Sequence, residues 1–313
     1  MKLGYTRMPN PDPISVDQDT ILDQIDLADK LGLELAYLPS LDPKILTGSK
    51  DLKTQNVHIG LDATAFGELS PRDLERAIRT TNDALWGKLV LGVEMGCGHG
   101  STQSRAQAQN FETMFSQAPR SSSGFVSSRY PMKSPCPKII GLPAKGTRDE
   151  VALAAACGYL PMTPSWLKVP DVARHWPAIV EGATASLRRA HPDHWKLARS
   201  VIVHNDRSVV QDYLFGSKSP VRKYYTRLAQ SGLIDMDVDK HMKRVVIAGS
   251  PNHVADQLLE LQESVCEIGT LQMVDHHDRD PEITRNTMVC LAETVLPMVN
   301  NTKVNITKEL ERT

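Results

Sequence analysis

The segment 275–278, DHHD, places side chains that bind metals or transfer protons next to one another near the C-terminus. A catalytic zinc ion takes three protein ligands from separate elements, but the first, second and fifth expected strands end without a histidine. His276 and His277 would also point to opposite faces of an extended chain. We therefore expect no metal site, and Asp275, His276 and His277 are candidates for proton transfer. The alternative is that both histidines are surface residues in a loop.

A second candidate is the turn 142–150, LPAKGTRDE, which joins an expected strand to an expected helix. The Lys145 ammonium, the N–H groups of Gly146 and Thr147 and the helix dipole would together bind a phosphate. Thr147 and Glu150 also have the spacing of a capping box. The alternative is therefore that Thr147 only caps its own helix.

Eight short apolar segments could position these side chains, because nearly all of them are separated by helical patterns. Such alternation indicates parallel strands, and eight of them favour a closed (β/α)8 TIM barrel with an insertion between strands 7 and 8. An open doubly wound sheet is the alternative, but no G-x-G-x-x-G opens its first helix. The segments are 1–5, 33–38, 57–63, 87–95, 138–142, 159–162, 196–205 and 270–274.

The barrel prediction selects further candidate site residues, because active sites of this fold lie at the carboxyl ends of the strands. The resulting candidates are Tyr5, Arg7, Ser40, Asp42, Asp62, Thr64, Glu94, Met95, Lys145, Thr147, Thr163, Trp166, His204 and 275–278.

Composition excludes several classes of function. The chain of 313 residues has a formal net charge of -1 and no run of Lys or Arg longer than two, so neither nucleic acid nor an anionic membrane is expected as a partner. No apolar stretch approaches the ~20 residues of a membrane span. Five scattered cysteines without a C-x-x-C pair indicate reduced thiols, and we expect a cytoplasmic protein.

The length fits a single barrel domain over 1–313. Residues 116–137 hold seven serines and four prolines with little periodicity. A run of this length and composition in a compact domain is typical of a lid or of a disordered loop, and both alternatives remain open.

Six stretches carry patterns that belong together. They are KLGLELAYL (30–38), ALWGKLVLGVEMGCG (84–98), LPAKGTRDEVALAAACGYLPMTPSW (142–166), KLARSVIVH (196–204), VVIAGSPNHVADQLLEL (245–261) and ETVLPMV (293–299). In this order they resemble the bacterial luciferase-like family of flavin-dependent monooxygenases, whose fold is a (β/α)8 barrel. The chain is short for that family, with trimmed loops around strands two and three.

The resemblance implies that reduced FMN, supplied by a separate flavin reductase, reacts with O2 to form a C4a-peroxyflavin that oxygenates an organic substrate. It also implies a homodimer. By this resemblance Lys145, Gly146 and Thr147 would meet the phosphate, and Glu94, Met95, Gly96 and Trp166 would lie near the ring. The strand-end candidates Tyr5, Ser40 and Asp62 would contact a small or mid-sized organic substrate.

Two departures from the family pattern keep alternatives open. The second expected strand ends in LPSLD (38–42), without the histidine that often assists the flavin chemistry, and Met95 stands where many members have a phosphate-binding arginine. Lys145 or Arg7 would have to replace that arginine. The alternatives to a monooxygenase are a flavin-binding relative with reduced catalytic activity and an oxidoreductase of the same barrel that uses the deazaflavin F420.

Overall fold

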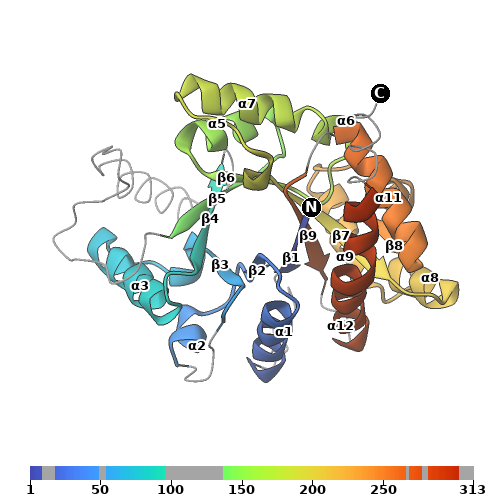
Figure 1. Ribbon diagram of the computed structural model, residues 1–313, viewed down its shortest axis with the longest axis horizontal. Coiled ribbons are helices and arrows are strands. Elements are labelled where there is room, and N and C mark those ends of the chain that lie inside the picture. Colours follow the sequence, from blue (N-terminus) through green and yellow to red (C-terminus); the bar gives the residue numbers. More distant parts are fainter. Residues whose placement is uncertain (9–17, 49–53, 96–136, 266–267, 277–280, 303–313) are drawn as a thin grey trace.

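Eight parallel strands close into a barrel, as the alternation of segments predicts (Figure 1). The computed structural model describes residues 1–8, 18–48, 54–95, 137–265, 268–276 and 281–302. The strands follow one another around the barrel in chain order, and the last pairs with the first. They are β1 (Lys2–Arg7), β2 (Leu35–Tyr37), β3 (His58–Asp62), β4 (Leu89–Met95), β5 (Lys138–Pro143), β6 (Leu160–Thr163), β7 (Lys196–Val203) and β9 (Thr270–Asp275).

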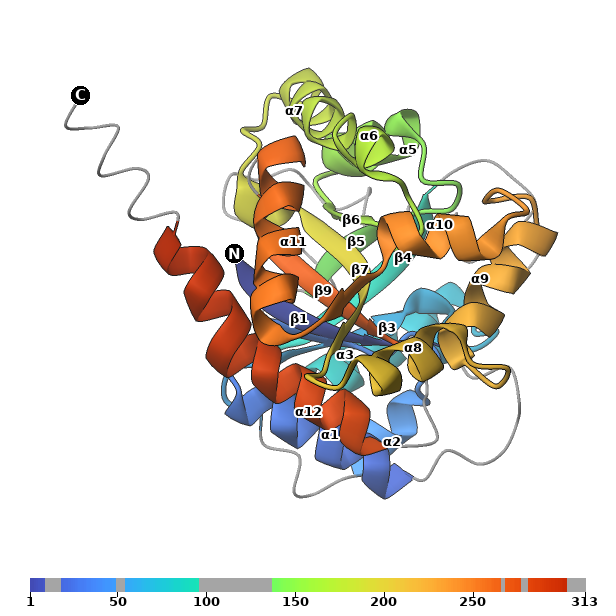
Figure 2. The same ribbon diagram turned by 90° about the vertical axis from the view of Figure 1, so that its right-hand side faces the viewer.

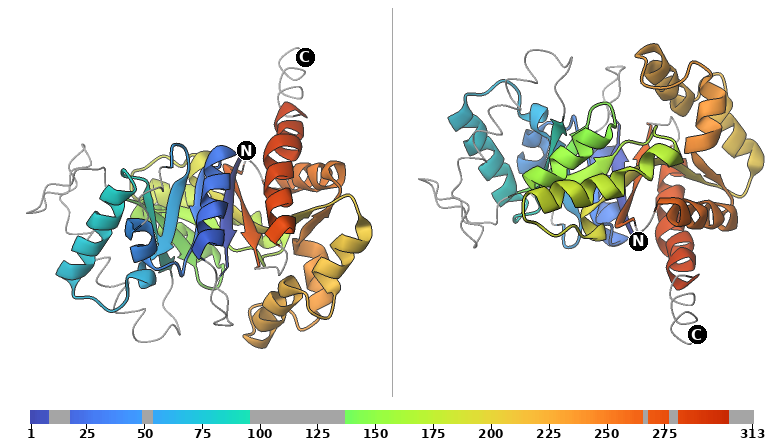
Figure 3. Two further views of the ribbon diagram at one scale, coloured as in Figure 1. Left: turned by 90° about the horizontal axis from the view of Figure 1, so that it is seen from below. Right: turned by 90° about the horizontal axis from the view of Figure 1, so that it is seen from above.

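The described helices pack around the outside of the barrel, and the orange helix α11 and the red helix α12 lie on the same flank (Figure 3). None of the described helices combines the length and apolar character that crossing a bilayer requires. The helices between the first seven strands are α1 (Gln18–Lys30), α2 (Pro43–Gly48), α3 (Pro71–Ala84), α5 (Arg148–Cys157), α6 (Val169–Val172) and α7 (His175–Ala185). Those after β7 are α8 (Arg207–Phe215), α9 (Pro220–Gln230), α10 (Val238–Val245), α11 (Pro251–Val265) and α12 (Pro281–Cys290), which continues through a π-helical turn at Leu291–Val295.

The expected insertion between the seventh and eighth barrel strands is present. It comprises α8, α9 and α10, which gather on one side of the barrel in Figure 2, and the short strand β8 (Ile247–Gly249). β8 pairs with the carboxyl half of β7, whereas β9 pairs with the amino half, so β7 splits its pairing between two neighbours. Sequence patterns did not predict β8, because three residues are too short for periodicity to register.

Local capping chemistry explains where the helices begin. The Ser70 side chain accepts a hydrogen bond from the backbone of Asp73, and Pro71 occupies the first turn of α3. Thr147 and Glu150 form the predicted capping box at the start of α5, and Gly158 ends this helix with φ of 79°. The sequence pattern of 169–189 predicts one helix, but this segment holds the two helices α6 and α7.

The register of the strands decides which side chains face the barrel interior. In Cα register, Tyr37 lies beside Gly60, and Asp62 lies beside Gly92. Since successive side chains alternate between the two faces, Tyr37, Asp62 and Glu94 point inward, whereas Tyr5 and Met95 point to the helices. This alternation separates candidate residues that are adjacent in sequence.

A buried ion pair lies at the amino end of the barrel. Lys196 Nζ lies 3.1 Å from Glu34 Oε2, and its side chain is only 3% exposed. Desolvation lowers the pKa of Lys196. Desolvation also opposes ionisation of Glu34, but the Lys196 charge and the Thr270 hydroxyl outweigh it and lower the pKa of this carboxyl. Above this pair the Gln272 amide fills the interior and donates to the Tyr5 carbonyl.

Candidate active site at the barrel mouth

A cavity of about 490 Å³ opens at the carboxyl ends of the barrel strands. Its volume falls within the ~300–1,000 Å³ of typical ligand pockets. Most of its lining is apolar, and its polar groups come from the strand ends and from the insertion. The lining residues are Thr6, Met8, Tyr37, Pro39, Asp62, Ala63, Thr64, Gly92, Val93, Glu94, Leu142, Pro143, Ala144, Met162, Pro164, Ser165, Trp166, Ala198, Tyr224 and Val274.

One side of this cavity holds a tyrosine–carboxylate pair. The Tyr37 hydroxyl donates a hydrogen bond to Asp62 Oδ1. Burial raises the pKa of Asp62 to about 6, the Tyr37 hydrogen bond opposes this shift, and the nearby Glu94 charge adds to it. Burial and the Asp62 charge raise the pKa of Tyr37 well above its usual value, so the phenol remains neutral. The pair therefore offers a carboxyl that exchanges a proton near neutral pH.

Gly92 makes room for this pair. A Cβ at residue 92 would lie 1.8 Å from the Tyr37 hydroxyl oxygen and 2.6 Å from Asp62 Oδ1. Both distances are far below van der Waals contact, so any larger residue must displace the pair.

Gly92→Ala is accordingly expected to destabilise the protein by about 1–3 kcal/mol and to lower activity, because overpacking shifts Tyr37 and Asp62. Urea unfolding and steady-state rates measure the two effects. Gly48→Ala is the control, since a Cβ there would meet nothing within 4 Å. Equal stability and activity of the two variants would contradict the close contact at Gly92.

The other side of the cavity carries Ser165, Trp166 and Tyr224. Ser165 and Tyr224 share a hydrogen bond of 3.2 Å between their hydroxyls, and His241 Nε2–H donates to the Trp166 carbonyl at 2.8 Å. Trp166 Nε1 and Thr6 Oγ1 are buried without a hydrogen-bond partner among the described residues. Buried polar groups are normally satisfied, so these two atoms suit a polar ligand in the cavity.

Four of the predicted site residues line this cavity: Asp62, Thr64, Glu94 and Trp166. Ser40 is exposed in the turn after β2 and does not line it. Met95 is buried on the outer face of β4, where its Cγ approaches the position of a Cβ on Gly141. The Met95 side chain therefore does not reach the barrel mouth, which corrects the prediction that it lies near the flavin ring. Predicted residues Gly96 and His277 lie outside the described residues, as does 116–137 apart from Pro137.

Tyr5 and Asp275 also face away from the cavity. The Tyr5 hydroxyl donates to Asp275 Oδ2 at 2.7 Å and approaches Gln24 Oε1 of α1 at 2.9 Å, while Thr284 of α12 donates to Asp275 Oδ1 at 3.2 Å. These contacts tie β1 and β9 to the surrounding helices. Strand alternation thus corrects two predictions. Tyr5 does not face a substrate in the cavity, and Asp275 does not face the cavity for proton transfer.

The turn before α5 uses its backbone donors internally. The N–H groups of Lys145 and Thr147 donate to the Glu150 carboxylate at 3.2 and 2.9 Å, and His175 Nε2–H donates to the Gly146 carbonyl at 3.1 Å. These contacts match the capping alternative, and a phosphate at this turn would compete with Glu150. The Lys145 side chain itself is exposed.

The alternative that His276 is a surface residue in a loop is wrong, because the side chain is buried. It is 7% exposed, and its Nε2 lies 2.7 Å from Ser200 Oγ. Its ring centroid lies 4.7 Å from that of Tyr224, which lines the cavity. Within the part of the chain that the structure describes, no three His, Cys, Asp or Glu side chains gather as a metal site.

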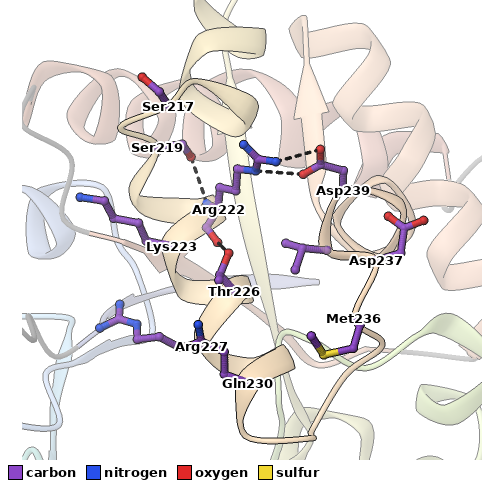
Figure 4. Close-up of a pocket in the computed structure, with 11 residues that line it drawn as sticks. Ser217, Ser219, Arg222, Lys223, Thr226, Arg227, Gln230, Met236, Asp237 and Asp239 are labelled. Carbon is purple, nitrogen blue, oxygen red and sulfur yellow. Dashed lines mark hydrogen bonds and ion pairs between the residues drawn. The ribbon is translucent and has the colours of Figure 1, made fainter.

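A second hollow, of about 840 Å³, lies between α9 and α10 on the outside of the insertion (Figure 4). Arg222 and Asp239 form an ion pair across it, with Nε 3.0 Å from Oδ1, and Lys223 and Arg227 line its edge. Its side chains come from these two helices and their flanking turns, and no barrel strand contributes to it. We therefore place the candidate active site at the barrel mouth.

Comparisons with solved structures agree with the barrel fold. The oxygenating constituent of 3,6-diketocamphane monooxygenase from the CAM plasmid of Pseudomonas putida, a type II Baeyer-Villiger monooxygenase in complex with FMN, has a TM-score of 0.75 at 16% identity, covering 95% of this chain and 98% of that chain. A monooxygenase from Streptomyces bottropensis has a TM-score of 0.71 at 17% identity, covering 95% and 99%. The chain has the luciferase-like barrel fold.

A coenzyme F420 dependent tetrahydromethanopterin reductase from Methanopyrus kandleri has the same barrel, with a TM-score of 0.62 at 15% identity, covering 95% of this chain and 99% of that chain. No family model matches the sequence, and no curated protein matches it. Flavin and deazaflavin enzymes thus share this luciferase-like fold, and the likeness confirms the predicted resemblance at the level of the fold.

Sequence reasoning missed Tyr37, Ser165 and Tyr224 as cavity residues. Tyr37 stands one residue before the end of the expected strand 33–38, and the available signal was that it shares a strand face with Leu35 in LELAYL. Tyr224 comes from α9, and no local pattern in a helix of the insertion indicates that its side chain reaches the barrel mouth.

Proposed function

We propose that this protein is a flavin-dependent monooxygenase that uses reduced FMN and O2 at the barrel mouth. The observation that carries the proposal is the Tyr37–Asp62 pair at the edge of a largely apolar cavity in a luciferase-like barrel. A carboxyl with a pKa of about 6 beside an apolar cavity is typical of a proton-transfer group in an enzyme.

The residues at the mouth fit a flavin ring. Met8, Leu142 and Met162 supply apolar contacts. Trp166 Nε1 and Thr6 Oγ1, which have no hydrogen-bond partner among the described residues, suit the polar edge of a flavin ring. No Lys or Arg is among the described residues that line the cavity. A phosphate would then rely on the exposed Lys145, which follows the lining residue Ala144.

The bound flavin would supply the electrons with which O2 oxygenates the substrate, and a separate flavin reductase would supply it in reduced form. The chain's own residues would have three tasks. Asp62, held by Tyr37, would accept a proton in the cavity. Apolar side chains such as Leu142 and Met162 would exclude water from the reacting groups. Trp166 and Thr6 would orient the cofactor by hydrogen bonds.

Direct binding tests the proposal. The purified protein is titrated with FMN, with FMN reduced under anaerobic conditions and with F420, and absorbance and fluorescence are recorded. Binding of reduced FMN supports the proposal, and failure to bind any of the three refutes it. Exclusive binding of F420 would instead assign the protein to the deazaflavin oxidoreductases that share this barrel.

Rapid mixing of the reduced-FMN complex with O2 separates an enzyme from a flavin-binding protein of reduced activity. An enzyme shows a transient absorbance that decays faster when substrate is present. Oxidation at the rate of free reduced FMN would favour the binding protein.

Trp166→Phe is expected to weaken cofactor binding about 2–10-fold, since a hydrogen bond of this kind contributes about 0.5–1.5 kcal/mol. The variant keeps an aromatic ring and removes only the buried Nε1 donor. Fluorescence titration measures the dissociation constant. Trp86→Phe, at a side chain that is 74% exposed, is the control and should bind as the wild type does. Equal affinity in all three proteins would remove Trp166 from the cofactor site.

The pH dependence of kcat/KM should report Asp62. A base must be ionised to accept a proton, so kcat/KM should fall about tenfold for each pH unit below an apparent pKa of about 6 and reach a plateau above it. Steady-state rates between pH 5 and 8 measure this limb. A flat profile over the same range would contradict Asp62 as the base.

A further inference from the structure

The wall of the barrel mouth carries negative charge without a balancing positive charge. Asp62 and Glu94 are the only charged side chains among the lining residues that the structure describes, since these include no Lys, Arg or His. Among the described residues, the Asp62 carboxylate accepts one hydrogen bond, from Tyr37 at Oδ1. The Glu94 side chain has neither a hydrogen bond nor an ion pair with any of them. The cavity therefore presents carboxylate oxygens that are free to accept from a ligand.

Strand pairing brings these two carboxylates together. Asp62 of β3 lies beside Gly92 of β4 in Cα register, and Glu94 follows two residues later on the same inward face of β4. The Glu94 charge adds to the rise in the pKa of Asp62, so each carboxylate acts on the other. A positive charge beside both would relieve this repulsion and favour their ionised forms.

Thr6 of β1 is independent evidence that the cavity takes a polar ligand. Its side chain is 5% exposed and lines the cavity, and its Oγ1 has no hydrogen-bond partner in the described part of the chain. Buried polar groups are normally satisfied. A hydroxyl has one donor and two acceptor positions, so Thr6 can donate to a cofactor and also accept from an N–H of a second ligand.

The rest of the lining indicates that the positive charge belongs to an organic molecule. Tyr37, Trp166 and Tyr224 contribute aromatic rings, whose faces attract cations, and Leu142 and Met162 add aliphatic surface. A bound metal ion would need more oxygen ligands than two carboxylates. No three side chains of the ligating types gather among the residues that the structure describes.

We propose that the barrel mouth binds a small organic cation, an alkylammonium compound whose nitrogen lies beside Asp62 and Glu94. Its N–H groups donate to the Glu94 carboxylate and to Asp62 Oδ2, and its hydrocarbon part lies against the aromatic and aliphatic wall. This inference rests on the proposed function for the fate of the cation, which would be the substrate that is oxygenated. The same carboxylates would repel the phosphate of FMN, which agrees with a phosphate held outside the cavity by Lys145.

The first test uses isothermal titration calorimetry of the ligand-free protein at pH 7. The probes are butylammonium, hexylammonium and octylammonium chloride, each compared with the alcohol of the same chain length. We expect the ammonium to bind about 10–100-fold more tightly than its alcohol, because its hydrogen bonds to carboxylates are charge-assisted. Equal affinities within every pair, or binding of neither member of any pair, would overturn the proposal.

Glu94→Gln tests where the cation binds. The amide keeps the shape of the side chain and removes its charge, so the affinity for hexylammonium should fall about tenfold while the affinity for 1-hexanol stays unchanged. Glu263→Gln, at an exposed position of α11, is the control and should bind both probes as the wild type does. An unchanged preference for the ammonium in Glu94→Gln would overturn the assignment to this cavity wall.

The pH dependence of binding tests the part played by Asp62. Tyr37 and Tyr224 are the other titratable groups of the described lining, and burial keeps both phenols neutral by raising their pKa. Asp62 ionises near pH 6, whereas an alkylammonium stays charged, so the affinity for hexylammonium should rise about 3–10-fold from pH 5 to pH 7. The rise should be absent for 1-hexanol and absent in Asp62→Asn. A rise that persists in Asp62→Asn would contradict the position of the cation.

These titrations contain no flavin, so their outcome is separate from that of the proposed function. A protein that prefers ammonium ions but binds neither FMN nor F420 would retain the cation site and lose the proposed monooxygenase activity. A protein that binds reduced FMN but does not distinguish hexylammonium from 1-hexanol would retain the proposed function and lose the inferred substrate class.

Discussion

Replacing Asp62 with asparagine is expected to lower turnover about 10²–10⁴-fold, since it removes the proton acceptor from the cavity. The amide retains the shape of the side chain, and its oxygen can still accept the hydrogen bond from Tyr37. The loss should therefore fall on kcat more than on cofactor affinity. The limb of the pH profile near pH 6 should disappear at the same time.

The same variant is expected to be more stable than the wild type at pH 7. Because the pKa of Asp62 rises from 3.8 to about 6 on folding, the folded state binds the proton more tightly than the unfolded state. The free energy of unfolding then falls as the pH rises from about 4 to 6, by up to about 3 kcal/mol. Asparagine has no charge to desolvate, so Asp62→Asn avoids this loss.

Urea unfolding at pH 4 and pH 7, together with rates, measures both effects. The two proteins should be nearly equal in stability at pH 4, and Asp62→Asn should exceed the wild type at pH 7. Asp23→Asn, at an exposed position of α1, is the control and should change neither quantity. A variant that is less stable at pH 7 and fully active would contradict the role of Asp62.

Lys196→Met should lower the free energy of unfolding by about 3–5 kcal/mol, because it leaves the Glu34 carboxylate without its partner in the barrel interior. Desolvation lowers the pKa of Lys196, and it opposes the lowering of the Glu34 pKa that Lys196 and Thr270 cause, so each charge depends on its partner. Urea unfolding with linear extrapolation measures the loss.

Removing both charges distinguishes an ion pair from a packing effect. The double variant Lys196→Met with Glu34→Leu should recover much of the lost stability, since neither charge remains buried. Lys30→Met is the control, because its contact with Asp26 is solvent-exposed and such pairs contribute roughly 0–1 kcal/mol. Equal effects of Lys196→Met and Lys30→Met would show that the interior pair does not stabilise the barrel.

The barrel was predictable because its signals are local. Each strand is a short apolar run. The start of α3 is indicated by Ser70 with Pro71, and the start of α5 by the capping box of Thr147 and Glu150. β8 and the division between α6 and α7 were missed, since a three-residue strand and a short break leave little periodicity.

The site was predictable only in part, because strand ends alone do not tell which face a side chain takes. Asp62 and Glu94 face the cavity, whereas Tyr5, Met95 and Asp275 are at similar strand ends and face the helices. The register of neighbouring strands decides between these outcomes, and register is set by tertiary pairing. Residues contributed by α9 carry no local signal, because the position of an insertion depends on packing.

The filled amino end of the barrel limits how molecules exchange at the mouth. Lys196, Thr270 and Gln272 are at most 2% exposed and lie between the cavity and that end. Among the described residues these side chains close the amino end, so under the proposed function cofactor and substrate would both enter through the mouth, and the one that binds deeper would bind first and leave last. Steady-state kinetics should accordingly follow a compulsory order of addition, with product competing against the last ligand to enter.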